Sequence, residues 1–250
     1  MSGHSKWATI KRKKGKLDAE RGKKFTRLIK ELTVAAREGG GDPDGNPRLR
    51  TAIAAAKADN MPADNIKRAI LKGTGQLPGV SYEAITYEGY GPGGVALYLE
   101  VLTDNKNRVV SEIRHVLTKY GGNLGANGCV AWMFHKRGVV TVDLDAANED
   151  NLMEAALEAG AEDIKTEAGV YEVVMEPAVL DDVRTAIEKK GIKIASAEVT
   201  MIPQSTTKLT REGDASSMLK MLDVLEENDD IQKVYSNFDI DQALMEKLAG

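Results

Sequence analysis

The segment between residues 138 and 203 restricts the fold more than any other part of the sequence. Its apolar residues follow a strand pattern or a helix pattern in turn, in the order strand, helix, strand, strand, helix, strand, starting at VVTVDL and ending at IASAEVTMIP. That order is the split βαβ arrangement of ferredoxin-like domains. We therefore predict a ferredoxin-like α/β domain over residues 138–203.

The N-terminal region has the pattern of a small helical bundle. Between Asp18 and Arg37 the apolar residues recur at the spacing of one helical stripe, and a run of glycines then ends the helix. The stripe consists of Phe25, Leu28, Ile29, Leu32, Ala35 and Ala36. Pro47 and Pro62 each suit the first turn of a further helix. We predict a three-helix bundle within an all-helical domain over residues 1–78.

The segment after residue 80 changes to strand patterns. Two strands are predicted around the turn Gly91-Pro92-Gly93-Gly94, followed by a helix over 107–120 and a further strand over 129–135. Beyond residue 203 the patterns predict one more helix and one more strand, which are too few to bury a core alone. We expect these late elements to complete the sheet that begins near residue 80.

The predicted fold class is therefore multidomain α+β. It combines the N-terminal three-helix bundle with two α/β domains of ferredoxin-like (split βαβ) type, one inserted in the other. The discontinuous middle domain comprises residues 79–137 plus 204–250, and the inserted acidic domain comprises 138–203.

Charge is distributed unevenly along the chain. The net charge is −4 overall, but residues 1–75 contain 18 Lys and Arg against 8 Asp and Glu, a net charge of +10. The remaining residues contain 16 against 30, a net charge of −14. Only the N-terminal part therefore suits a polyanionic partner such as nucleic acid.

The N-terminal basic residues are the predicted nucleic-acid contacts, because their density suits the neutralisation of several backbone phosphates. They are Lys6, Lys11, Arg12, Lys13, Lys14, Lys16, Arg21, Lys23, Lys24, Arg27 and Lys30. Trp7 is a candidate for stacking on a base or for anchoring the arm on the bundle. Arg48 and Arg50 either widen this basic surface or are ordinary exposed helix residues. The alternative to binding is a solvated helix face, which is less favoured because few acids alternate with these lysines.

The sequence offers no constellation for catalysis or for a cofactor. The three histidines are far apart, without the Cys or His neighbours of a metal site, and Cys129 lies in an apolar segment. A calcium-loop pattern starting at Asp143 fails at its turn glycine, where Asn148 stands. The glycine-rich loops lack phosphate-binding fingerprints. We predict no enzyme activity, no cofactor, no metal and no small-molecule substrate. The loop Tyr90, Gly91, Pro92, Gly93 and Gly94 remains a candidate functional loop.

The sequence also predicts a cytoplasmic protein with no membrane association. No apolar run approaches the roughly 20 residues that span a bilayer, and the N-terminus lacks the pattern of a secretory signal. The single cysteine suits a reducing compartment. An organelle precursor stays open as an alternative, and the sequence does not set the oligomeric state.

Several long blocks resemble the YebC/PmpR family. They are GHSKWATIK, RGKKFTRLIKELTVAAREGGGDPDGNPRLRTAI, NMPADNIKRAI, ITYEGYGPGGVALYLEVLTDNKNR and GGNLGANGCVAWMF. The resemblance covers residues 3 to about 138 closely and the acidic remainder loosely. It implies an all-helical N-terminal domain and two α/β domains, one interrupted by the other. Two departures are Cys129, where a small residue such as serine is common, and the acids of Asp18-Ala19-Glu20.

The resemblance implies two functions for one basic surface. Family members are regarded as DNA-binding transcriptional regulators, and this chain is expected to be such a regulator, with phosphate-dominated binding and modest sequence preference. The alternative is a ribosome-associated translation factor that binds rRNA and relieves stalling at proline-rich stretches. A mitochondrial branch of the family activates translation of a respiratory subunit.

Overall fold

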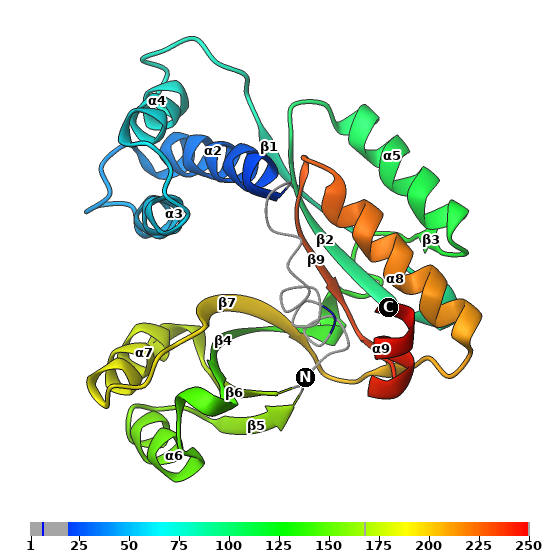
Figure 1. Ribbon diagram of the computed structural model, residues 1–250. Helices are drawn as coiled ribbons and strands as arrows, with labels where there is room; N and C mark the ends of the chain where they lie inside the picture. The colour runs from blue at the N-terminus through cyan, green and yellow to red at the C-terminus, as the bar shows by residue number, and fades with distance from the viewer. Residues whose placement is uncertain (1–6, 8–19, 168, 250) are drawn as a thin grey trace. The chain divides into compact units, whose positions relative to one another are not determined.

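The structure is a computed structural model that describes Trp7 and residues 20–249, apart from residue 168 (Figure 1). The chain divides into two compact units. The first unit contains residues 20–129 together with Gly213–Val234, and the second contains Trp7, Val130–Glu212 and the residues from Tyr235 onward. Each unit is described separately below.

Three helices form the bundle that the sequence predicted, and they belong to the first unit. They are α2 (Glu20–Gly39), α3 (Pro47–Ala58) and α4 (Ala63–Gly73). Their shared core contains Leu32, Ala35, Ala36, Leu49, Ala52, Ala56, Met61, Ile66 and Ala69. The apolar stripe of α2 contributes to this core, as its helical spacing predicted.

Two residues fix how the helices of the bundle meet. Asn46 caps α3 by accepting a hydrogen bond from the Leu49 backbone amide at 3.0 Å, and its side-chain amide donates to the Ala35 carbonyl at 2.8 Å. At Gly73, an added Cβ would lie 2.3 Å from the carbonyl oxygen of Thr33 in α2. Glycine at this position therefore allows α4 to approach the α2 backbone closely.

The first unit also contains a four-stranded sheet in the order β3-β1-β2-β9. The strands are β1 (Glu83–Tyr90), β2 (Ala96–Thr103), β3 (Asn123–Leu124) and β9 (Ile231–Ser236). Figure 1 shows the helices α5 (Lys106–Lys119) and α8 (Glu212–Glu227) covering the same face of this sheet. Strand β9 thus joins strands that precede it by more than a hundred residues.

The element order of this sheet differs in one respect from the prediction. The chain enters it through the antiparallel hairpin of β1 and β2, before its first helix. A split βαβ unit instead passes from its first strand directly into a helix. The middle domain therefore has α/β architecture with its own strand connectivity, and the domain boundaries predicted near residues 78, 137 and 203 stay predictions.

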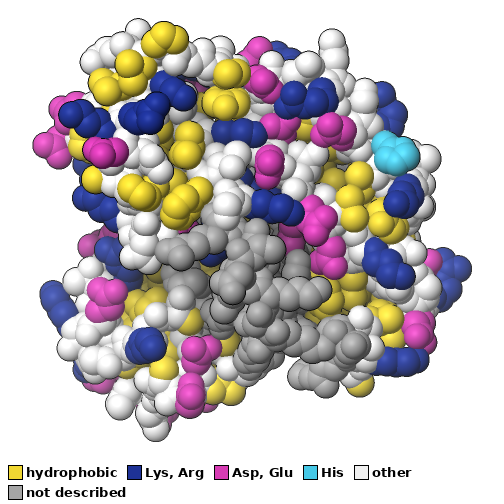
Figure 2. Space-filling view, turned by 45° about the horizontal axis from the view of Figure 1, so that its top comes forward, with side chains coloured by type: hydrophobic (Ala, Val, Ile, Leu, Met, Phe, Trp, Pro, Cys, Tyr) yellow, Lys and Arg dark blue, Asp and Glu magenta, His cyan; other side chains and the backbone are white. Residues whose placement is uncertain are grey.

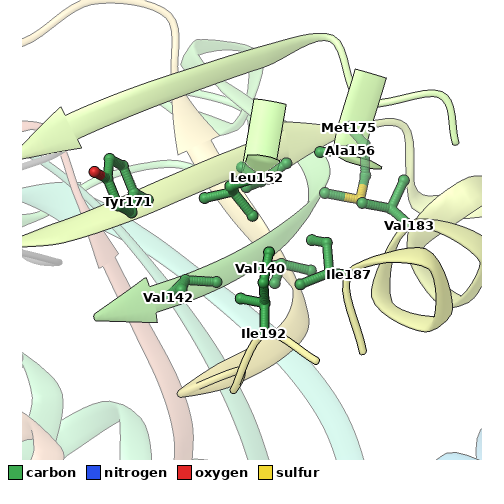
Figure 3. Close-up of a cluster of buried hydrophobic side chains, with 10 residues drawn as sticks. Val140, Val142, Leu152, Ala156, Tyr171, Met175, Val183, Ile187 and Ile192 are labelled. Carbon is green, nitrogen blue, oxygen red and sulfur yellow. The ribbon is translucent and has the colours of Figure 1, made fainter. Parts of the chain in front are cut away.

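The second unit has the split βαβ order that the sequence predicted. Its sheet has the order β5-β6-β4-β7, and all three neighbouring pairs are antiparallel. The strands are β4 (Phe134–Asp143), β5 (Asp163–Glu167), β6 (Val170–Met175) and β7 (Ser196–Pro203), and the helices are α6 (Glu149–Glu158) and α7 (Leu180–Lys189). Figure 3 shows the core between them, where Leu152, Val183 and Ile187 of the helices face Val140 and Val142 of the sheet.

The strand predicted over residues 129–135 is not formed as such. Ala131–Met133 make a single 3₁₀ turn, and Phe134 instead begins β4, which runs continuously through Gly138. An added Cβ at Gly138 would lie 2.9 Å from Met175 Cγ of β6. Gly138 is therefore a point of close packing inside a strand, whereas the sequence pattern suggested a boundary there.

The remaining elements are short. Strands β8 (Thr207–Lys208) and β10 (Phe238–Asp239) pair in parallel, and α9 (Gln242–Ala249) follows them. Further 3₁₀ turns lie at Pro92–Gly94, Leu144–Ala146 and Pro177–Val179.

Candidate nucleic-acid interface

The predicted nucleic-acid contacts divide into two groups. Lys6, Lys11, Arg12, Lys13, Lys14 and Lys16 lie outside the described residues, and the side chain of Arg21 on α2 is not described. The structure therefore informs four of the predicted contacts, all on α2: Lys23, Lys24, Arg27 and Lys30.

Lys30 lies inside the first unit. Its side chain is only 8% exposed, and its ammonium is 2.5 Å from Oδ1 of Asp230 and 2.9 Å from the backbone oxygen of Asp229. The same ammonium lies 5.5 Å from the centroid of the Tyr82 ring, a cation–π distance. Lys30 therefore does not present its charge to an external phosphate in this structure, which differs from its predicted role.

Asp230 is the buried centre of a polar cluster that ties three elements together. Besides Lys30 of α2, its carboxylate accepts hydrogen bonds from Thr103 Oγ1 of β2 at 3.0 Å and from Arg108 Nη2 of α5 at 2.6 Å. Burial alone would raise the pKa of Asp230, but the hydrogen bonds from Lys30 and Arg108 outweigh it and hold the pKa below its usual value. We call these four residues the Asp230 cluster.

Arg27 and Arg37 also bind within the first unit. One guanidinium nitrogen of Arg27 donates to the Glu226 backbone oxygen and to that of Asn228, the latter at 3.3 Å. Both carbonyls lie at the C-terminal end of α8, where a cation is favoured by the helix dipole. Arg37 donates to the Ser81 hydroxyl at 2.5 Å and to the backbone oxygen of Tyr82. Arg27 thus holds α2 against the end of α8, and Arg37 holds it against the segment that precedes β1.

Other basic residues of the bundle pair with its acids. Arg48 forms ion pairs of 2.7 Å with Glu31 and 2.5 Å with Glu38. The hydrogen bond that Arg48 donates to Glu31 raises the pKa of Arg48, against the opposing effect of burial. Lys24 lies 3.5 Å from Asp59. Because each of these cations has an acidic neighbour, their contribution to a positive surface is reduced.

A different set of basic residues has no such neighbour. The side chains of five residues make no hydrogen bond or ion pair within the part of the chain that the structure describes: Lys23, Lys57, Lys67, Arg68 and Lys72. Four of them are on α3 and α4, outside the predicted set. The signal that would have identified the α4 residues is local, because three cations accompany a single acid, Asp64, in that helix.

The charged side chains on the surface do not form a continuous basic patch on the face shown in Figure 2. In Figure 2 the Lys and Arg side chains of the face shown are interspersed with Asp and Glu side chains. The set of predicted contacts on α2 therefore contains fewer available cations than the sequence suggested, since Lys24 and Lys30 are paired with carboxylates.

The candidate functional loop is built largely by packing and turn geometry. Gly91 and Pro92 are buried, and the Gly91 amide donates to the Val95 carbonyl at 2.8 Å. Gly93 and Gly94 adopt left-handed φ angles of 69° and 78°, which favour glycine. The Tyr90 hydroxyl donates to the Cys129 carbonyl at 3.3 Å. A binding role for this loop stays a prediction.

Three further observations concern Trp7, metal binding and membrane-spanning helices. Trp7 is 7% exposed and belongs to the second unit, so its ring is not free to stack on a base in this structure. Among the described residues, no group of three or more Cys, His, Asp or Glu is placed to hold a metal ion. No helix in the same part of the chain has the length and apolar character to span a membrane.

Comparisons with known proteins cover nearly the whole chain. Residues 5–76 match the family model described as the TACO1/YebC protein N-terminal domain, and residues 82–238 match the TACO1/YebC second and third domain. A protein of Syntrophus aciditrophicus named "Probable transcriptional regulatory protein" is 60% identical over 100% of both chains. One of the same name from Trichlorobacter lovleyi is 61% identical over 99% of this chain and 100% of its own.

A solved structure shares the fold. The crystal structure of the conserved hypothetical protein Aq1575 from Aquifex aeolicus is 48% identical, with a TM-score of 0.81, over 91% of this chain and 93% of that one. This likeness and the two matched models confirm the resemblance found from the sequence blocks. The chain belongs to the TACO1/YebC family.

Proposed function

We propose that this protein is a regulator of gene expression that binds DNA through its basic N-terminal domain. The observation that carries the proposal is the charge distribution, with +10 in residues 1–75 and −14 in the remainder. A molecule with this polarity orients its basic end toward a polyanion. The names of its relatives, probable transcriptional regulatory proteins, support the same function.

The binding is proposed to be dominated by phosphate contacts. The unpaired cations of the bundle and the basic arm suit backbone phosphates, whereas no helix-turn-helix or zinc-finger signature supplies a base-reading element. We therefore propose strongly salt-dependent affinity with modest sequence preference, no catalytic step, and a cytoplasmic location.

The test measures the affinity of the full chain for a 30-base-pair duplex by fluorescence anisotropy between 50 and 200 mM salt. A matched variant replaces Lys11, Arg12, Lys13 and Lys14 with alanine. Each lost phosphate contact reduces the magnitude of the slope of log K against log salt by about 0.9. The slope of the variant is therefore expected to be smaller in magnitude than that of wild type by about 3 to 4. An unchanged slope would show that the arm does not contact the duplex.

A second experiment separates DNA from the ribosome. Tagged protein is sedimented from cell lysate through a sucrose gradient, with and without nuclease. The proposal expects a light fraction and a discrete footprint on promoter DNA. Comigration with ribosomes would contradict the proposal and favour the translation-factor alternative.

A further inference from the structure

The outward face of α4 is the strongest basic feature among the described residues of the bundle. Ile66 and Ala69 bury the opposite face against the bundle core, and Gly73 brings the end of the helix against α2. Lys67, Arg68 and Lys72 are exposed on the remaining face. The helical spacing thus separates an apolar side that packs from a basic side that meets solvent.

These three cations are not used for internal pairing. Lys24, Lys30 and Arg48 each have a carboxylate partner within 3.5 Å. In contrast, the side chains of Lys67, Arg68 and Lys72 make no hydrogen bond or ion pair to any described residue. The one acid of the helix, Asp64, leaves a net charge of +2 on α4.

We infer that Lys67, Arg68 and Lys72 form a second contact surface for nucleic-acid phosphates, which we call the α4 surface. The inference rests on the proposed function and names residues of the bundle that contribute to it. From Lys67 to Lys72 the helix rises by about 7.5 Å, at roughly 1.5 Å per residue. One strand of a duplex carries a phosphate about every 3.4 Å along its axis. A helix lying along the backbone therefore brings these cations to neighbouring phosphates of one strand.

The rigidity of α4 favours this role. Its apolar side is held in the bundle core, and the close approach at Gly73 fixes it against the α2 backbone. Cations on a packed helix keep their spacing before the ligand arrives, so less conformational entropy is lost on binding. Arg68 adds a planar guanidinium that suits two phosphate oxygens at once.

The test compares two variants with the same change in net charge, in the full chain. One is the triple variant K67Q/R68Q/K72Q. The control, K189Q/K193Q/K220Q, removes three cations that are also exposed and make no ion pair within the described residues. Binding of each to a 30-base-pair DNA duplex and to an RNA hairpin is measured against salt.

For duplex DNA, the slope of log K against log salt is expected to be smaller in magnitude by about 2 to 3 in the α4 variant. This change is equivalent to roughly 10²- to 10³-fold weaker binding at 0.1 M salt. The control is expected to match wild type closely. A loss of affinity for the RNA hairpin alone would support the α4 surface as a phosphate contact but contradict DNA as the partner. Equal affinities of the two variants would overturn the inference while leaving the proposed function standing.

Two further outcomes complete the test. If wild type binds neither probe, the proposed function fails and the inference with it. If the circular dichroism of the α4 variant shows a folding defect, the charge-retaining variant K67R/R68K/K72R decides: it is expected to bind within about threefold of wild type, because cations at these positions suffice. A loss of tenfold or more in that folded variant would contradict a phosphate role.

Discussion

Replacing Asp230 with asparagine tests whether the Asp230 cluster holds α2 against the middle domain. The substitution keeps the side-chain shape but removes the charge that faces Lys30 at 2.5 Å and Arg108 at 2.6 Å. Because the Lys30 side chain is only 8% exposed, its ammonium would remain buried without a countercharge. Breaking a buried ion pair from one side costs about 3 to 5 kcal/mol.

The loss is best measured as local opening by amide hydrogen exchange, since a chain with several domains need not unfold in one step. At about 1.4 kcal/mol per tenfold change, the expected loss of about 3 to 5 kcal/mol speeds exchange in the docked part of α2 by roughly 10²- to 4 × 10³-fold. Strand β6 lies in the second unit and serves as the internal reference, with unchanged exchange expected.

Asp229 provides a matched control one residue away. Its side chain is exposed, and only its backbone oxygen accepts from Lys30. The variant D229N removes the same charge and is expected to change stability by less than about 0.5 kcal/mol. If D230N opened α2 no more than D229N did, the reasoning about the buried pair would be wrong.

Three further predictions follow from pH dependence and from packing. Because the folded pKa of Asp230 is lowered, the stabilising effect of its carboxylate is complete above the unfolded pKa near 3.8 and is lost as the pH falls through the folded pKa. Amide hydrogen exchange of α2, measured at decreasing pH, should show this loss in wild type and not in D230N. The variant G73A is expected to destabilise the chain by about 1 to 3 kcal/mol through overpacking, whereas G45A, where an added Cβ meets nothing within 4 Å, should be near neutral in thermal unfolding. On α6, L152A removes a fully buried side chain and should lower the free energy of unfolding in urea by about 2 to 5 kcal/mol. L157A removes a side chain that is 47% exposed and should lower it much less. Equal losses in the two variants would contradict the assigned core.

Most of the fold could be predicted because its signals are local. The apolar stripe of α2 and the alternating strands of the second sheet depend on spacing within a few residues, and they identified the bundle and the split βαβ unit. The exception at Gly138 has a tertiary cause. Its place inside β4 depends on the close approach of Met175, which no pattern near residue 138 records.

The candidate site was less predictable because pairing is a long-range property. Lys30 occupies a polar position on its helix, but its partner Asp230 is 200 residues away in sequence. Arg48 likewise finds Glu31 on another helix, 17 residues away. Sequence could locate the cations of the bundle, whereas only the structure separates those already paired from those that are free.

The return of β9 to the first sheet has a consequence for how the chain folds. Thr103 of β2 and Asp230, next to β9, are 127 residues apart in sequence, so their contact closes a long loop. In the second unit, Phe134 pairs with Pro203, which brings the two ends of the intervening domain together. Folding of that domain first would roughly halve the loop that must close and lower its entropic cost by about 0.6 kcal/mol. During synthesis the ferredoxin-like unit is therefore expected to form before the sheet that surrounds it in sequence is complete.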